Sequence, residues 1–101
     1  MTDATLIGKK LLDCEGGMIG TIDDIVVDPR TLVSEWVKVR FGILRDRTLV
    51  PFIDVYADAR WPAVCALTKR QVRDAPPVRD PYLDAATRHE LLEYYGIDDP
   101  A

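Results

Sequence analysis

The segment Met18-Ile-Gly-Thr-Ile-Asp-Asp-Ile-Val-Val27 sets the architecture of this chain. Its apolar residues recur at every second position from Met18 to Ile22 and then resume in the other phase at Ile25. Because a strand changes faces at every residue, a spacing of three requires one extra residue in the ladder. We therefore predict a long, bent strand with a β-bulge at Asp23-Asp24, an irregularity that helps small barrels curl a sheet closed.

Further strands are expected on both sides of this segment. Alternation after the Asp28-Pro29 turn places Val37, Val39 and Phe41 on a buried face, opposite a wet face. The last short strand carries apolar residues on both faces, which implies that something covers its outer side. The expected strands comprise residues 6–13, 18–27, 36–41, 48–53, 54–58 and 63–67.

The C-terminal part of the sequence predicts helices. Thr68 and Gln71 form a capping box at the start of a short helix, near residues 69–74. A second helix begins after Asp84, ends near Tyr95 and is followed by Gly96. We expect a barrel domain over residues 1–75 and a proline-rich connector with a C-terminal helix over residues 76–101. This apolar helix is expected to cover its own barrel, with coverage of a neighbouring subunit as the alternative.

Composition indicates one soluble, globular domain. The chain has 101 residues, of which 48% are hydrophobic and 30% charged, and a net charge of −4. This acidic balance argues against nucleic acid as a partner. The sequence has neither a membrane-spanning run nor a signal peptide, so we expect a cytoplasmic protein without membrane insertion. Cys14 and Cys65 are expected to be free thiols.

Residues that could perform chemistry are few, and we assign no catalytic, cofactor-binding or metal-binding residue. Three carboxylates could supply oxygen ligands to a hard cation: Asp23, Asp24 and Asp28. Adjacent strand residues point to opposite faces, however, which favours a solvated rim of the barrel. His89 has no nucleophilic partner, and the acidic neighbours of Cys14 disfavour a thiolate.

Aromatic and basic residues provide candidates for an interface. Trp36 lies on the polar face of its strand, where it either meets a partner or packs under the C-terminal helix; both alternatives remain open. A cluster of cations near the third hairpin could meet phosphate or an acidic protein, although a solvated face is favoured. The candidate interface residues are Trp36, Trp61, Leu91, Tyr94 and Tyr95, and the candidate basic patch is Lys38, Arg40, Arg45 and Arg47.

Several motifs together resemble the PRC-barrel domain family. They are Leu6-Ile7-Gly8-Lys9-Lys10, Glu15-Gly16, Ile19-Gly20-Thr21-Ile22-Asp23-Asp24, Asp28-Pro29, Leu49-Val50-Pro51, the segment 68–76 and the segment 90–96. The resemblance implies a small, six-stranded antiparallel β-barrel, as in the cytoplasmic part of the photosynthetic reaction centre H subunit and the C-terminal half of a ribosome maturation factor. Both barrels serve as docking or assembly modules, and the family has no common catalytic residues.

Two residues depart from the family pattern. Leu32 stands where members commonly carry glycine, and a left-handed backbone at a leucine would be strained, which favours another turn form. Gly17 replaces a residue that is usually polar, which would leave the first hairpin loosely specified.

We expect a noncatalytic protein-interaction or assembly module that forms a homodimer and binds an unidentified protein. A membrane-associated protein remains open as that partner. The alternatives are an accessory factor in ribosome or RNA maturation and a small-molecule or redox sensor that uses the barrel interior or Cys65.

Overall fold

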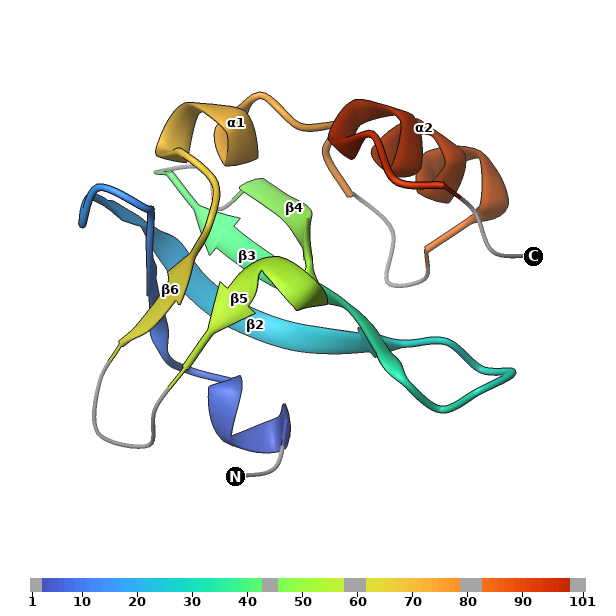
Figure 1. Cartoon of the computed structure of the whole chain (residues 1–101), viewed down its shortest axis with the longest axis horizontal. Coiled ribbons are helices and arrows are strands. Elements are labelled where there is room, and N and C mark those ends of the chain that lie inside the picture. The colour runs from blue at the N-terminus through green and yellow to red at the C-terminus, as the bar shows by residue number, and fades with distance from the viewer. Residues whose placement is uncertain (1–2, 43–45, 58–61, 79–82, 99–101) are drawn as a thin grey trace.

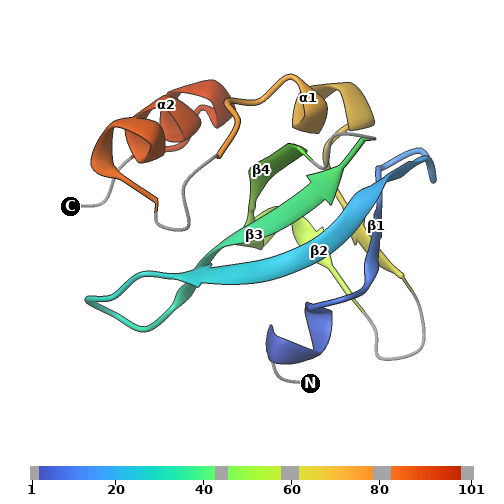
Figure 2. The same cartoon turned by 180° about the vertical axis from the view of Figure 1, so that it is seen from behind.

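The computed structural model of the protein describes residues 3–42, 46–57, 62–78 and 83–98. Among these residues the strands form one curled, six-stranded sheet, with the helices α1 and α2 beside it (Figures 1 and 2). The elements are η1 (Asp3–Leu6), β1 (Lys10–Leu12), β2 (Met18–Val27), β3 (Ser34–Phe41), β4 (Asp46–Pro51), η2 (Phe52–Asp54), β5 (Val55–Tyr56), β6 (Ala63–Cys65), α1 (Lys69–Arg73) and α2 (Ala85–Tyr95).

The strand order is β4-β3-β2-β1-β6-β5, which corrects two details of the predicted barrel. The sheet is mixed, because β1 and β6 run parallel through the pairs Leu11–Ala63 and Leu12–Val64. It is also open, because its edge strands β4 and β5 do not pair among the described residues. The 3-10 turn η2 joins the two edge strands without reversing the chain, so β6, which is antiparallel to β5, runs parallel to β1.

The predicted bulge in β2 is confirmed. Ile22 pairs with Val39 and Asp24 pairs with Lys38, so Asp23 is the extra residue on this strand. Because of this extra residue, Ile22 and Ile25 both face the core.

A second irregularity, against β1, was not predicted. Leu11 pairs with Gly20 while Leu12 pairs with Met18, so Ile19 is the extra residue there. Ile19 consequently turns inward, while Met18 is 44% exposed, so the period of two does not continue unbroken from Ile22 to Met18.

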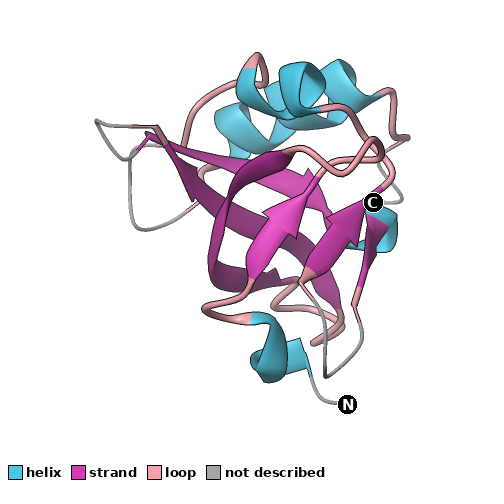
Figure 3. Ribbon diagram, turned by 90° about the vertical axis from the view of Figure 1, so that its left-hand side faces the viewer, coloured by secondary structure: helices cyan, strands magenta, loops and turns pink. Residues whose placement is uncertain are grey.

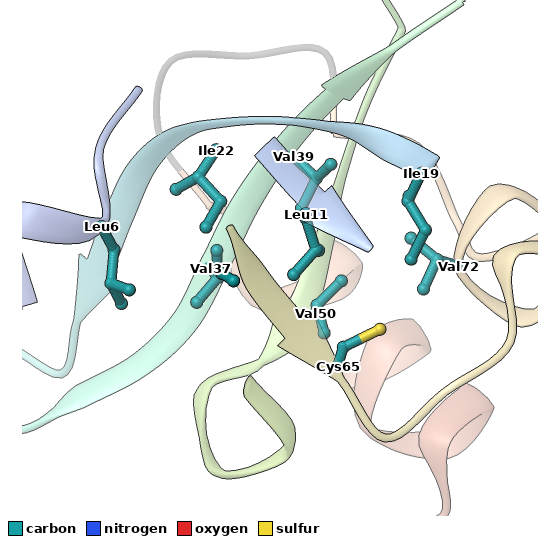
Figure 4. Close-up of a cluster of buried hydrophobic side chains, with 10 residues drawn as sticks. Leu6, Leu11, Ile19, Ile22, Val37, Val39, Val50, Cys65 and Val72 are labelled. Atoms are coloured by element: carbon teal, nitrogen blue, oxygen red, sulfur yellow. The ribbon is translucent and has the colours of Figure 1, made fainter. Parts of the chain in front are cut away.

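Aliphatic side chains from all parts of the sheet fill its interior (Figure 4). Val37 and Val39 alternate inward from β3 as predicted, and Val72 of α1 closes one end of this cluster. The buried members are Leu6, Leu11, Ile19, Ile22, Val37, Val39, Val50, Ala63, Cys65 and Val72. The described interior is thus a packed core.

The helices begin and end where the sequence predicted. Thr68 and Gln71 make the reciprocal capping box of α1. The side chain of Asp84 accepts from the backbone N–H of Thr87 at the start of α2, and Gly96 takes the left-handed conformation after its end. Local side-chain chemistry fixes these positions without help from the rest of the fold.

The strands predicted over residues 6–13, 48–53, 54–58 and 63–67 extend beyond the observed β1, β4, β5 and β6. Leu6 belongs to η1, and β1 starts only at Lys10. Phe52 and Ile53, expected in a strand, lie in η2. β4 ends at Pro51, which lies on an edge strand, where a missing backbone donor is tolerated.

The turn between β2 and β3 keeps a left-handed residue at Leu32, with φ of 60°. The expectation that leucine would force another turn form is therefore wrong. The backbone N–H of Leu32 donates to the carbonyl oxygen of Asp28 at 2.7 Å, and the N–H of Asp28 donates to that of Val33 at 2.9 Å. These bonds across the turn hold Leu32 in a conformation that leucine rarely adopts.

Candidate protein-binding surface

Trp36 lies fully buried on the outer face of β3, where α2 covers it. Its ring centroid is 6.2 Å from that of Tyr95, and Leu91 belongs to the same buried cluster. The indole N–H donates to Glu35 Oε1 at 2.9 Å, and the same oxygen accepts from Arg88 Nε of α2 at 2.7 Å. Of the two alternatives for Trp36, the structure has the packing one, and α2 covers the sheet of its own chain.

The two tyrosines at the end of α2 attach this helix by hydrogen bonds. The hydroxyl of Tyr95 donates to the carbonyl oxygen of Leu49 at 2.7 Å, and burial raises the pKa of Tyr95. The hydroxyl of Tyr94 donates to the carbonyl oxygen of Gln71 at 2.6 Å. The structure thus joins four predicted interface residues within one chain, while Trp61 lies outside the described residues.

The predicted basic patch is partly neutralised by the bulge residue. Asp23 Oδ2 lies 2.8 Å from Arg47 Nε, and its other carboxylate oxygen lies 3.6 Å from Arg40 Nη1. The hydrogen bond from Arg47 is the main cause that holds the pKa of Asp23 below its ordinary value. Lys38 pairs across strands with Asp24, and Arg45 lies outside the described residues. These carboxylates reduce the positive charge that phosphate would meet.

The two arginines that share the Asp23 carboxylate belong, together with Lys10, to a row across the outer face of the sheet. Arg47 is paired with Arg40, Arg40 with Thr21, and Thr21 with Lys10. Because paired residues point to the same side of a sheet, their side chains share the outer face. This acidic protein therefore carries a basic row on one face of β4, β3, β2 and β1.

An apolar row lies next to the basic row on the same face. Met18 is paired with Leu12, Leu12 with Val64, and Val64 with Tyr56. Met18, Val64 and Tyr56 are 44%, 38% and 63% exposed. In Figure 3 the longer helices lie above the strands rather than in front of them. We call these four residues the apolar row.

The apolar row was not predicted, although the sequence contained a signal for it. Apolar residues on both faces of 63–67 indicated a cover on the outer side of β6. In the structure α2 covers β3 and β4 instead, and Val64 stays accessible. The cover that the sequence implies is thus missing from the described part of the chain.

A hollow of about 440 Å³ lies where the two rows meet, lined by Met18, Thr21, Arg40, Phe41 and Arg73 among others. The guanidinium of Arg73 lies over the Phe41 ring, 5.6 Å from its centroid, and donates to the carbonyl oxygen of Ile19 at 3.3 Å. This hollow therefore offers guanidinium groups beside apolar surface.

Asp13 specifies the first hairpin, which the sequence was expected to leave loose. Its Oδ1 accepts from the backbone N–H groups of Gly17 at 2.7 Å and Glu15 at 2.9 Å. Its Oδ2 accepts from the N–H of Lys69, at 3.1 Å, so it also ties the hairpin to α1. These donors, Gly17 first, hold the pKa of Asp13 below its ordinary value.

We predict that acid destabilises the fold below about pH 4 but not between pH 7 and pH 5. Asp13, Asp23, Asp28 and Asp84 have lowered pKa values, the first by the N–H of Gly17 and the second by Arg47. A carboxyl whose folded pKa lies below its unfolded value of about 3.9 stabilises the fold above that pH. The contribution is lost as the pH falls through the folded pKa. Urea unfolding at a series of pH values measures it.

Asp13→Asn provides the matched control for this pH dependence. The amide keeps one acceptor oxygen but turns N–H groups toward a backbone donor, so the melting temperature should fall by roughly 5–10 °C at pH 7. The acid-dependent part of the stability should shrink as well. A wild-type unfolding free energy that stays level down to pH 3 would contradict the role of these carboxylates.

Residues with reactive side chains are not gathered in the described part of the chain. Cys65 is buried, donates its thiol to the carbonyl oxygen of Leu67 at 3.4 Å, and has a pKa raised by burial. His89 pairs with Glu93 on the exposed side of α2. Among the described residues, Cys14 and Cys65 are free, and no group of three or more His, Cys, Asp or Glu could hold a metal ion. No helix there is long and apolar enough to cross a membrane.

Comparison with protein families identifies the barrel. The model of the PRC-barrel domain matches residues 1–64. The chain belongs to the PRC-barrel family. The match extends from the N-terminus through β5 and into β6, so it includes Met18, Leu12, Val64 and Tyr56 of the apolar row. Comparison with curated proteins finds no match. In this PRC-barrel protein, α1 and α2 lie beyond the matched region.

Proposed function

We propose that this PRC-barrel protein is a noncatalytic protein-interaction module whose partner docks on the apolar row. One observation carries the proposal: α2 covers the outer face of β3 and β4, while Met18 of β2, Tyr56 of β5 and Val64 of β6 are exposed apolar side chains on the same face. Contiguous apolar surface at the rim of a well-packed domain marks interaction sites. The packed interior supports a role for the surface rather than for an internal ligand.

The chemistry beside the apolar row selects the partner. Lys10 lies two residues before Leu12 on β1 and on the same face, and Arg40 lines the hollow at the Met18 end. A segment that presents apolar side chains next to carboxylates complements both rows. We therefore propose an acidic, partly apolar protein segment as the ligand. We also propose a cytoplasmic location, where free cysteines are usual.

Replacing Tyr56 with glutamate should weaken capture of this partner about tenfold or more. Tyr56 is the most exposed member of the apolar row, and a carboxylate there repels an acidic ligand as well as removing contact area. Immobilised full-length protein is incubated with an extract of the source cells, and the retained proteins are quantified by mass spectrometry.

Ile7→Glu provides the matched control, because Ile7 is an exposed apolar residue outside the apolar row. This variant should retain the partner at the wild-type yield. Equal recovery by the wild type and Tyr56→Glu would refute the assigned surface. Retention of RNA instead of protein, with a strong dependence on salt, would favour the maturation alternative.

We further propose that the chain forms a homodimer, the commonest oligomer of soluble proteins. The fold exposes a second group of apolar residues, Val27, Leu32 and Val33, at the end of the β2–β3 hairpin. Light scattering over a range of concentrations tests this proposal, and a mass that stays at one chain would refute it.

A further inference from the structure

The β2–β3 hairpin projects beyond the rest of the sheet and passes below α2 (Figures 1 and 2). Leu32 and Val33, at its end, are 79% and 63% exposed. We call these two residues the hairpin tip. Exposure of these apolar side chains to water is unfavourable, so we expect another molecule to bury them.

The backbone at Leu32 is the only one with positive φ among the described non-glycine residues. Glycine would adopt this conformation without strain, whereas leucine crowds its Cβ against the backbone. The exposed side chain recovers little by packing within the chain. The two hydrogen bonds across the turn hold this backbone, but they would hold glycine equally well, so a leucine at this position points to a functional constraint. The turn thus holds a large apolar side chain outward at a cost in stability.

A hollow that fits such a side chain lies on the same chain, between the hairpin and α2. Its volume is about 570 Å³, and Val26, Leu49, Val78 and Leu83 contribute apolar lining. Its polar lining carries charges of both signs, from Asp24, Glu35, Lys38 and Arg88 among others. An apolar protrusion and an apolar hollow on one molecule make it self-complementary.

We propose that two copies of the chain dock on each other through their hairpin tips. Each copy inserts its Leu32 and Val33 into the hollow of the other. The contact is isologous, so the same tip and the same hollow are used twice around a two-fold axis. Charges of both signs around each hollow let equal surfaces meet without net repulsion. This inference rests on the proposed homodimer and names the surface that forms it.

Leu32→Gly and Leu32→Asn test the inference, because both residues tolerate the left-handed turn and remove the apolar side chain. Each variant should raise the dissociation constant of the dimer about tenfold or more in light scattering. At dilutions where the wild type is a single chain, each should melt at the same temperature as the wild type or higher. A weaker dimer with an undamaged fold excludes misfolding as the cause.

Leu83→Glu tests the hollow, since it places a carboxylate among the apolar lining. It should weaken the dimer to a similar extent, and an unchanged near-ultraviolet circular dichroism spectrum, to which the buried Trp36 contributes, would show that α2 stays in place. Tyr56→Glu, on the apolar row, provides the control and should leave the dimer intact.

The possible outcomes distinguish failure of the hairpin-tip contact from failure of the homodimer proposal on which it rests. A wild type of single-chain mass at every concentration would refute the homodimer itself. If the wild type is a dimer and Leu32→Gly dimerises equally well, insertion of the hairpin tip is refuted, while the homodimer proposal is retained. Loss of the dimer in Leu32→Gly but not in Leu83→Glu would show that the hairpin tip does not bind in this hollow.

Discussion

Replacing Trp36 with alanine is expected to lower the free energy of unfolding by about 3–5 kcal/mol. The indole is fully buried between β3 and α2, where Leu49, Leu91 and Tyr95 surround it. Its removal opens a cavity in this second core cluster and deletes the hydrogen bond to Glu35, which also holds Arg88 of α2. Urea unfolding monitored by circular dichroism measures the loss, and hydrogen exchange should show α2 exposed first.

Two further substitutions calibrate this prediction. Trp36→Phe keeps an aromatic ring but no indole N–H, and we expect a smaller loss, of about 1–2 kcal/mol. Tyr56→Ala removes an exposed aromatic side chain and should change the stability by about 0.5 kcal/mol or less. A loss below about 1 kcal/mol in Trp36→Ala, with the exchange of α2 unchanged, would show that this side chain does not hold the helix.

Gly20→Ala is expected to cost about 3 kcal/mol, a large effect for a single methyl group. Gly20 is buried where β3 crosses close to β2. A Cβ at this position would overlap the carbonyl oxygen of Arg40 and lie 3.0 Å from Phe41 Cβ. Because the overlap is with backbone, no side-chain rotation relieves it, and the two strands must move apart. The midpoint of urea unfolding measures the change.

Thr21→Ala is the matched control, since Thr21 is the next residue on β2 and lies on the outer face with Lys10 and Arg40. It should cost about 0.5 kcal/mol or less. If Gly20→Ala were equally mild, the close approach of β2 and β3 would have to relax easily, and the tight crossing described here would be wrong.

The bulge at Asp23 was predictable because it follows from counting along the chain. Ile22 and Ile25 must both face the core, and an odd spacing allows this only with an extra residue. The caps of α1 and α2 were predictable for the same reason: each depends on side chains within a few residues of the helix end.

The parallel pairing of β1 with β6 was not predictable from such local rules. Phe52 and Ile53 have the composition of a strand, and the sequence was therefore expected to continue β4 to residue 53. In the structure these two residues lie in the 3-10 turn η2, in which Phe52 packs against the core and Ile53 is exposed. That turn sets the direction of β5, and it depends on the packing of the whole sheet rather than on local sequence.

The candidate interface was also predictable only in the part that depends on local sequence. The sequence singled out four large side chains as candidates for an interface: Trp36, Leu91, Tyr94 and Tyr95. Three of them, Trp36, Leu91 and Tyr95, lie in one cluster within the chain. The sequence did not reveal that they cover one another, and the exposed apolar row depends on strand neighbours far apart along the chain. Met18 and Tyr56 belong to one surface only because β1 and β6 lie between their strands.

The parallel contact between the first and last strands delays the completion of folding during synthesis. Leu11 meets Ala63 across an interval of the chain that contains four of the six strands. The β1–β2, β2–β3 and β3–β4 hairpins can form as they emerge, but the other edge of β1 must wait until β6 has left the exit tunnel. Until then one edge of the nascent sheet stays unpaired, so the final ordering step is expected to be slow and vulnerable to misassembly with neighbouring nascent chains.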